Sequence, residues 1–208
     1  MYQTIGFIGT GNMGSAVASA AARSGRTERI LLANRTPARA EELARELPGA
    51  ETAANGETAA RAQLIFLGVK PQMMGEVLAQ ISPILRERKD RCILVTMAAG
   101  LTCARIRELA GLDCPVIRMM PNTPAAIGAG VIQYCGLDVS EEELDEFAAL
   151  LAPAGLVDRV EERLIDAGSA VFGCGPAFAY LFIEALADGG VACGLPRDKA
   201  LRLSLIHI

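Results

Sequence analysis

The first fifteen residues constrain the fold more than any other stretch of the chain. An apolar run over residues 5–8 leads into Gly9-Thr10-Gly11-Asn12-Met13-Gly14, and small residues follow it. A strand, a G-x-G-x-x-G turn and a helix in this order predict a dinucleotide-binding unit. We expect Gly9 to allow the tight turn, Gly11 to admit the pyrophosphate, and Gly14 to let the helix press onto the sheet. The helix N-terminus would then hold the phosphates through backbone N–H groups and its dipole.

The end of the next apolar run, residues 29–33, predicts which cofactor is bound. It carries Asn34-Arg35-Thr36-Pro37, with no acidic residue. At this place an acid binds the ribose 2′-hydroxyl of NAD, whereas an arginine accommodates the 2′-phosphate of NADP. We therefore expect NADPH, with Arg35 as the partner of the phosphate and Asn34 and Thr36 as neutral donors; NADH stays open as an alternative. Arg35 could instead be an ordinary solvated arginine.

Three further apolar runs, residues 64–69, 92–96 and 116–120, are of the kind buried on both faces of a parallel sheet. Residues just past the carboxyl ends of such strands line the ligand crevice. We therefore expect cofactor contacts from two clusters: Val69, Lys70 and Pro71, and Ala98, Ala99 and Gly100. For Lys70, a solvated position after the strand is an equal alternative. The third run ends in Pro121-Asn122-Thr123-Pro124, a rigid turn that offers polar groups at the same edge.

These patterns predict an α/β fold of the Rossmann type, with a doubly wound and mainly parallel sheet over residues 1–160. Further strands are expected at residues 130–134 and 156–160, and helix caps at Asn55, Thr102 and Ser140. Beyond residue 160 the pattern is wholly helical, so the domain boundary is placed near Glu161. Residues 161–208 then form the beginning of a second, all-helical domain.

The helical part pauses at Gly173-Cys174-Gly175-Pro176 and resumes over residues 177–193. Gly175 and Pro176 suit a close approach to another helix or to the nicotinamide. The face formed by Phe178, Leu181, Phe182, Ala185 and Leu186 is apolar at helical spacing and predicts packing against another helix. So short a segment cannot form its own core, so it needs more chain or a partner subunit.

Charge and composition exclude several classes of partner. The 208 residues carry a net charge of −4 without a run of Lys and Arg, which does not favour nucleic acid or an anionic membrane. The uncharged run over residues 167–183 is interrupted by glycines and is expected to fall short of a membrane span. No signal-peptide pattern is present at the N-terminus, so a cytoplasmic location is expected.

The cysteines predict neither a metal site nor disulfides. Six of them lie far apart, without a C-x-x-C pair and with a single histidine: Cys92, Cys103, Cys114, Cys135, Cys174 and Cys193. This spacing is typical of small buried hydrophobes in a reducing compartment.

Together the motifs resemble the pyrroline-5-carboxylate reductase family, along the chain to about Leu203. The resemblance rests on Phe7-Ile8-Gly9-x-Gly11-Asn12-Met13, Val69-Lys70-Pro71-Gln72, Ala98-Ala99-Gly100 and Arg118-x-Met120-Pro121-Asn122-Thr123-Pro124. Its most specific part is Gly173-Cys174-Gly175-Pro176-Ala177-Phe178, followed by Glu184-Ala185-Leu186-Ala187-Asp188-Gly189-Gly190-Val191 and Gly194-Leu195-Pro196-Arg197.

The resemblance implies a Rossmann domain followed by a helical domain that interleaves with its partner in a dimer, with dimers often assembling further. It implies hydride transfer from NAD(P)H to the C=N carbon of 1-pyrroline-5-carboxylate, which gives L-proline in the last step of proline biosynthesis. The family's cofactor contacts correspond to Gly9 to Gly14, Asn34 to Thr36, Asn55, Val69, Lys70 and Ala99. We expect Asn122, Thr123, Gly175 and Pro176 on the substrate side.

Two departures from the family pattern stand out. Phe172 occupies a position that is usually a small serine. The family also continues with further helices and a serine-proline-glycine-glycine segment before a threonine, which supplies the substrate-carboxylate pocket and a proposed proton donor. The chain is therefore expected to be a C-terminally truncated copy whose catalytic residue is unassigned, and His207 is a poor candidate.

Two other functions stay open. One is an NADP-binding module without turnover. The other is a different NADP-linked imine or hydroxyacid reductase, although the helix after Gly175 carries no lysine until Lys199.

Overall fold

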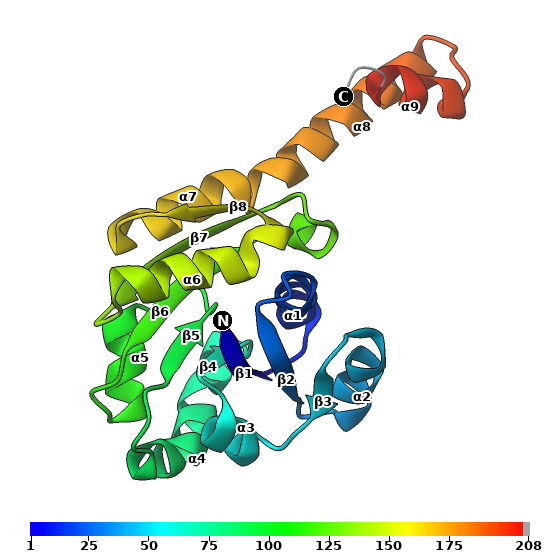
Figure 1. The fold of residues 1–208 in the computed structure, drawn as a ribbon. Coiled ribbons are helices and arrows are strands. Elements are labelled where there is room, and N and C mark those ends of the chain that lie inside the picture. Colours follow the sequence, from blue (N-terminus) through cyan, green and yellow to red (C-terminus); the bar gives the residue numbers. More distant parts are fainter. Residues whose placement is uncertain (206–208) are drawn as a thin grey trace. The chain divides into compact units, whose positions relative to one another are not determined.

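The computed structural model describes residues 1–205 (Figure 1). Contacts within the chain divide it into two compact units, Met1–Asp166 and a second that begins at Ala167. The predicted boundary near Glu161 lies slightly earlier in the chain. His207 lies outside the described residues.

A single sheet of eight strands forms the centre of the first unit, in the order β3-β2-β1-β4-β5-β6-β7-β8. The strands are β1 (Tyr2–Ile8), β2 (Thr27–Ala33), β3 (Ala50–Thr52), β4 (Leu64–Leu67), β5 (Ile93–Thr96), β6 (Val116–Pro121), β7 (Gly130–Leu137) and β8 (Gly155–Arg159). The first six run parallel, β7 is antiparallel to β6, and β8 is parallel to β7. This confirms the predicted Rossmann-type, mainly parallel sheet.

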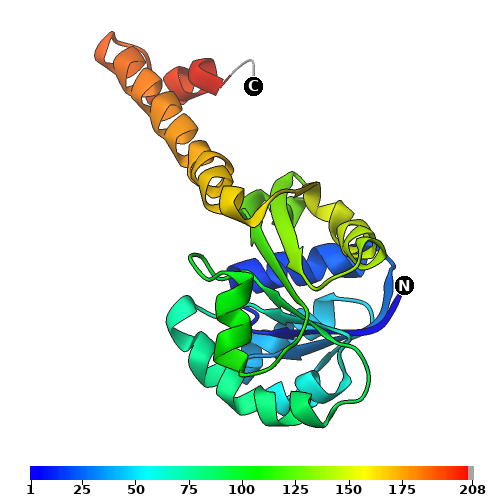
Figure 2. The same ribbon diagram turned by 90° about the vertical axis from the view of Figure 1, so that its left-hand side faces the viewer.

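Six helices cover this sheet. They are α1 (Asn12–Arg23), α2 (Pro37–Glu46), α3 (Asn55–Arg61), α4 (Met74–Glu87), α5 (Cys103–Ala110) and α6 (Glu141–Leu151). Helices α3, α4 and α5 contact one another in a row, whereas α1 packs beside α6 (Figures 1 and 2). The strand order reverses between β1 and β4, and the carboxyl ends of these strands therefore open a crevice for a ligand.

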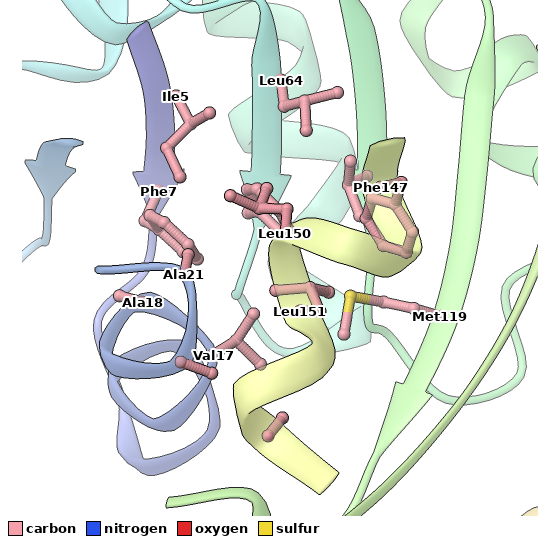
Figure 3. Close-up of a cluster of buried hydrophobic side chains, with 14 of the residues drawn as sticks. Ile5, Phe7, Val17, Ala18, Ala21, Leu64, Met119, Phe147, Leu150 and Leu151 are labelled. Carbon is pink, nitrogen blue, oxygen red and sulfur yellow. The ribbon is translucent and has the colours of Figure 1, made fainter. Parts of the chain in front are cut away.

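Aromatic stacking holds the centre of the sheet under α1 and α6 (Figure 3). Phe7 of β1 stacks on Phe66 of β4, with ring centroids 4.4 Å apart, and Phe147 of α6 lies 6.2 Å from Phe66. Small buried residues on α1, among them Ala18 and Ala21, let the helix lie close to the strands. The two strands on either side of the crevice are thus fixed by one packed core.

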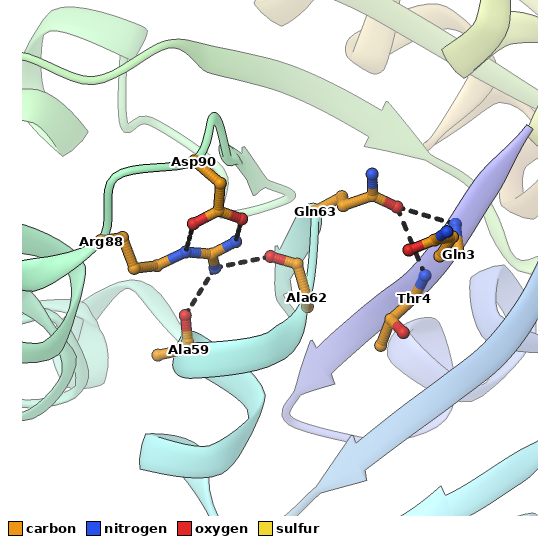
Figure 4. Close-up of polar contacts among 7 residues, drawn as sticks. All are labelled: Gln3, Thr4, Ala59, Ala62, Gln63, Arg88 and Asp90. Carbon is orange, nitrogen blue, oxygen red and sulfur yellow. Dashed lines mark hydrogen bonds and ion pairs between the residues drawn. The ribbon is translucent and has the colours of Figure 1, made fainter.

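Polar contacts anchor the connection that leads into β4 (Figure 4). Arg88, just past α4, donates from Nη1 to the carbonyl oxygens of Ala59 and Ala62, at 2.7 Å each, and pairs with Asp90. These bonds satisfy carbonyls at the end of α3 that have no partner within the helix. The side-chain oxygen of Gln63 accepts from the backbone N–H of Gln3 at 2.7 Å, which ties the same connection to β1.

Two of the three predicted helix caps are confirmed. The Thr102 side chain accepts from the backbone N–H of Arg105, and Ser140 forms a capping box with Glu143. The prediction for Asn55 is wrong. Helix α3 begins one residue earlier than expected, so Ala54, with an extended backbone, is the N-cap and Asn55 is the first helical residue. The side chain of Asn55 instead donates from Nδ2 to Oε1 of Gln80 on α4, at 2.8 Å.

The second unit is helical: it contains α7 (Ile165–Phe172) from Ala167 onward, then α8 (Gly175–Ala192) and α9 (Arg197–Leu205). Helices α8 and α9 pack against each other, and the small residues Ala187 on α8 and Ala200 on α9 are both buried. The predicted apolar face of α8 is uncovered within the described residues, and Phe178 and Phe182 are 68% and 66% exposed.

Two sequence-based expectations about this unit are wrong. Cys174 and Cys193 are exposed, because they flank α8 and no described segment covers them; Cys103 and Cys135 are buried as expected. The helical segment Glu162–Ala192 has 31 residues, and by length and composition alone it could cross a membrane. The glycines at 173 and 175 do not shorten it as expected, since the chain makes only a brief turn there. An apolar helix in a subunit interface meets the same criteria.

Candidate functional site

The glycine loop between β1 and α1 has the geometry that a bound pyrophosphate requires. Gly9 has a φ of +101°, which a residue with a Cβ rarely adopts. A Cβ on Gly14 would lie 2.2 Å from the carbonyl oxygen of Gly9, so only glycine lets α1 approach the loop. A Cβ on Gly11 would meet nothing within 4 Å, so the backbone there faces open space. Gly9 thus makes the positive-φ turn expected of it and Gly14 gives a close approach of α1 to the loop, whereas the contact of Gly11 with a pyrophosphate stays a prediction.

The N-terminus of α1 is left available for an anion. Gly11 is the N-cap and offers no side-chain cap, and no acidic residue lies in the first turn. The N–H groups of this turn and the positive end of the helix dipole therefore face the open space beside Gly11. The buried hydroxyl of Thr10, which is 3% exposed as a residue, also finds no hydrogen-bond partner among the described residues. An orphaned buried donor at this position fits a phosphate oxygen.

Asn34 joins the end of β2 to this loop. Its Oδ1 accepts from the backbone N–H of Thr10 at 3.2 Å, and its Nδ2 donates to the carbonyl oxygen of Thr36 at 2.9 Å. The sequence predicted Asn34 as a donor to the ribose, and the structure shows in addition that its amide orients the loop.

A cavity of about 680 Å³ opens at the reversal point between β1 and β4. It brings together seven of the predicted cofactor residues: Gly9, Gly11, Asn34, Arg35, Asn55, Val69 and Lys70. Arg35 and Lys70 are the basic residues of its lining and Glu76 is the acidic one, which gives the cavity a positive balance. A cavity of this size, charge and position fits an extended polyanionic ligand such as a dinucleotide.

A smaller cavity of about 250 Å³ is also lined by the glycine loop and shares Gly11 with the larger one. Its lining includes Thr10, Gly11 and Asn12, and also Arg39 of α2, which the sequence analysis did not single out.

The remaining predicted residues do not line either cavity. In the first unit these are Met13, Gly14, Thr36, Pro71, Ala98, Ala99, Gly100, Asn122 and Thr123. Gly14 acts through packing, as shown above. Oδ1 of Asn122 accepts from the backbone N–H of Val131 at 2.8 Å, so this side chain holds the exit of β6 against β7. Gly175 and Pro176 begin α8 in the second unit.

Sequence reasoning missed one whole wall of the larger cavity. Gln72, Met73, Glu76, Val77 and Gln80 come from the turn before α4 and from α4 itself. The helix that directly follows Val69 and Lys70 is a signal that could have found Gln72, Met73 and Glu76, because its first turn must begin at the carboxyl edge of the sheet. Gly68 was missed as well, and a Cβ on it would lie 2.4 Å from the carbonyl oxygen of Gly9.

Comparison with known proteins identifies the family. A family model described as NADP oxidoreductase, coenzyme F420-dependent, matches residues 4–100, and one described as pyrroline-5-carboxylate reductase dimerisation matches residues 162–206. The chain is 39% identical over 205 residues to the pyrroline-5-carboxylate reductase of Pisum sativum, covering 97% of this chain and 73% of that protein. The chain belongs to the pyrroline-5-carboxylate reductase family.

Solved structures of pyrroline-5-carboxylate reductases share this fold. The enzyme from Coxiella burnetii superposes with a TM-score of 0.86 at 28% identity, over 96% of this chain and 74% of that one. The Plasmodium falciparum enzyme, solved with NADP bound, gives a TM-score of 0.79 at 30% identity, over 98% of this chain and 74% of that one. The resemblance found in the sequence motifs is therefore confirmed.

Proposed function

We propose that the chain reduces 1-pyrroline-5-carboxylate to L-proline, the last step of proline biosynthesis, with NADPH as the reductant. Family membership supports the reaction, because relatives that are 39% and 37% identical are named for it, and this chain covers 73% and 76% of their length. NADPH supplies the hydride for the C=N carbon when it is bound. A protonated imine is already electrophilic, so the protein mainly has to position it against the cofactor.

The observation that carries the cofactor assignment is the combination of the open glycine loop with Arg35 in one cavity. The loop offers the N-terminus of α1 and the orphaned hydroxyl of Thr10 to the pyrophosphate. Arg35 follows Asn34 at the end of β2, where the ribose 2′-phosphate of NADPH is expected, and no acidic residue competes with it there. Lys70 would add a second cation to the same cavity.

The substrate would meet the nicotinamide at the exits of the strands farther along the sheet. We assign Ala98, Ala99 and Gly100 to the nicotinamide side, and the residues Asn122, Thr123, Gly175 and Pro176 to the substrate side. Small residues after β5 support a close approach of a planar ring to the backbone. No residue is assigned as the proton donor.

We further propose that the chain works in the cytoplasm as a homo-oligomer and binds neither nucleic acid nor membrane. The exposed apolar face of α8 and the match to a dimerisation model support self-association. The free thiols of all six cysteines support a reducing compartment. The net charge of −4 opposes binding to nucleic acid.

A coupled pair of measurements tests this function. Oxidation of NADPH by the full chain is followed through the absorbance of the reduced nicotinamide at ~340 nm, with and without 1-pyrroline-5-carboxylate. Proline is quantified in the product. We expect oxidation that depends on the imine, with one proline formed for each NADPH consumed and slower turnover with NADH. NADPH binding is measured separately by fluorescence titration. Binding without imine-dependent oxidation would overturn the reductase assignment and leave a cofactor-binding module, and turnover of other imines in preference would point to a different reductase.

A further inference from the structure

Three elements of the first unit bring two thiols and a carboxylate together, away from both cavities. Cys103 is the first residue of α5, Cys135 lies on β7, and Glu162 opens the one-turn helix Glu162–Leu164. The two Sγ atoms are 4.0 Å apart, and one ligand atom from each of the three residues lies within 4.8 Å of the others. Both cysteines are buried, at 2% and 8% exposed.

The surrounding residues orient this cluster. Oε1 of Glu162 accepts from the backbone N–H of Cys103 at 2.7 Å, which holds the carboxylate against the start of α5. Arg118 is paired with Cys135 in the register of β6 and β7, and its buried guanidinium lies 3.8 Å from the same oxygen of Glu162. Nη2 of Arg118 also donates to Asp166 at 2.5 Å. The cluster is therefore held in place by contacts to neighbours that do not use the thiols.

We propose that Cys103, Cys135 and Glu162 bind one thiophilic divalent cation of the Zn²⁺ class. Tetrahedral zinc with Zn–S bonds of about 2.3 Å places two thiolate sulfurs about 3.8 Å apart, close to the spacing found here. Two thiolates and one carboxylate form a donor set that zinc accepts, whereas magnesium and calcium prefer oxygen alone. This proposal is independent of the reductase function.

Charge balance supports a divalent ion. Around the two thiols, Glu162 and Asp166 carry two negative charges against the single positive charge of Arg118. Metal binding replaces two thiol protons with one ion of charge +2, so the net charge of the buried cluster does not change. Arg118 therefore offsets one of the two carboxylate charges in both states.

An intramolecular disulfide is the competing use of the same pair. It would require the sulfurs to close from 4.0 Å to about 2.0 Å, and it would not involve the carboxylate of Glu162. The geometry favours the metal, and the experiment distinguishes the two.

Cobalt is the probe for the test, because thiolate ligation gives Co²⁺ an intense charge-transfer absorption that carboxylates do not give. The reduced, metal-free full chain is titrated with Co²⁺ and then with Zn²⁺. We expect one Co²⁺ per chain with thiolate absorption, and one equivalent of Zn²⁺ to abolish it. Zn²⁺ added to the metal-free chain in weak buffer should release two protons per ion.

Matched variants locate the ligands. Cys103→Ser and Cys135→Ser should each lose the thiolate absorption of the wild type, whereas Cys174→Ser should keep it. Glu162→Gln retains an acceptor for the Cys103 N–H, and it should raise the dissociation constant by roughly 10- to 100-fold or more. Glu161→Gln, at the neighbouring exposed position, should leave it unchanged.

Three results would overturn the proposal. These are a wild type without thiolate absorption, a Glu162→Gln titration equal to that of the wild type, or a purified reduced chain whose mass shows that Cys103 and Cys135 have reoxidised to a disulfide in the presence of Zn²⁺. Proton release and the Glu162→Gln titration do not depend on the folding of the serine variants.

Discussion

The side-chain oxygen of Asn34 accepts a hydrogen bond from the backbone N–H of Thr10, and this bond ties the end of β2 to the glycine loop. The amide nitrogen of Asn34 is engaged at the same time, by the carbonyl oxygen of Thr36. One side chain therefore sets the position of the pyrophosphate loop relative to the ribose end of the cavity.

The Asn34→Asp variant keeps a side-chain acceptor for the hydrogen bond from Thr10 but replaces a neutral side chain with a negatively charged one. The carboxylate can still accept from Thr10, but it brings a negative charge to the place where the 2′-phosphate of NADPH is expected. We expect NADPH affinity to fall at least about tenfold relative to NADH affinity. Fluorescence titration with both cofactors measures the ratio. Asn34→Ala is the control and should weaken both cofactors alike; a ratio unchanged in Asn34→Asp would contradict the assignment.

Arg35→Ala tests the source of the cofactor preference. A charge-assisted contact to the phosphate contributes about 1.5 to 3 kcal/mol, so its loss should raise the dissociation constant of NADPH by roughly 10- to 100-fold and leave that of NADH unchanged. Arg29→Ala, an exposed arginine near the start of β2, is the matched control. If Arg35→Ala binds both cofactors like the wild type, Arg35 is an ordinary surface arginine.

Alanine at Gly11 and at Gly14 should give opposite phenotypes, although the two positions are three residues apart. At Gly14 the new Cβ would lie 2.2 Å from the backbone oxygen of Gly9, so we expect a loss of about 1 to 3 kcal/mol in unfolding free energy. At Gly11 the methyl group meets no protein atom within 4 Å and enters the cavity, so stability should hold while NADPH binding weakens. Thermal unfolding and NADPH titration of both variants check this. A Gly11→Ala variant that binds NADPH normally would refute the phosphate position.

The glycine loop could be predicted from the sequence because its requirements are local. Gly9 needs a positive φ, and Gly14 must avoid the oxygen of a residue only five positions away. The lining by Gln80 could not be predicted in this way, because it depends on how α4 lies against α3, which is decided by packing between the helices.

The cysteines show the same limit. Cys103 and Cys135 are 32 residues apart, and they meet only because β7 returns antiparallel beside β6 and because α5 packs across the same strands. The contact therefore could not be predicted from the spacing of the two cysteines in the sequence. For Cys174 and Cys193 the prediction of burial was wrong, because their burial depends on what covers α8.

Glu143→Gln should reduce stability in a pH-dependent way. The carboxylate of Glu143 accepts from Nη2 of Arg91 at 2.8 Å and from the backbone N–H of Ser140 at 2.9 Å. The bond from Arg91 lowers the pKa of Glu143 below its ordinary value. The resulting stability is present above the pKa of an unfolded glutamate and is lost as the pH falls through the lowered folded value. We expect a loss of about 1 kcal/mol at pH 7 that shrinks below about pH 4.

Urea unfolding of wild type and Glu143→Gln between these pH values measures the effect. Glu87→Gln, at the exposed end of α4, is the control and should follow the wild type at every pH. A difference between wild type and Glu143→Gln that grew as the pH fell would contradict the role of the Arg91 contact.

Self-association should depend on the exposed face of α8. Phe178 and Phe182 lie one helical turn apart and are 68% and 66% exposed, so a second copy of the chain can bury both. Burial of one such ring contributes about 1.5 to 3 kcal/mol, and the double variant Phe178→Glu with Phe182→Glu should weaken the dimer at least about 100-fold. Light scattering after size-exclusion chromatography should then report a monomer, whereas Ala60→Glu on the exposed side of α3 should keep the wild-type mass. If the double variant retains the wild-type mass, the interface lies on another surface, because two buried carboxylates facing an apolar partner could not be accommodated there.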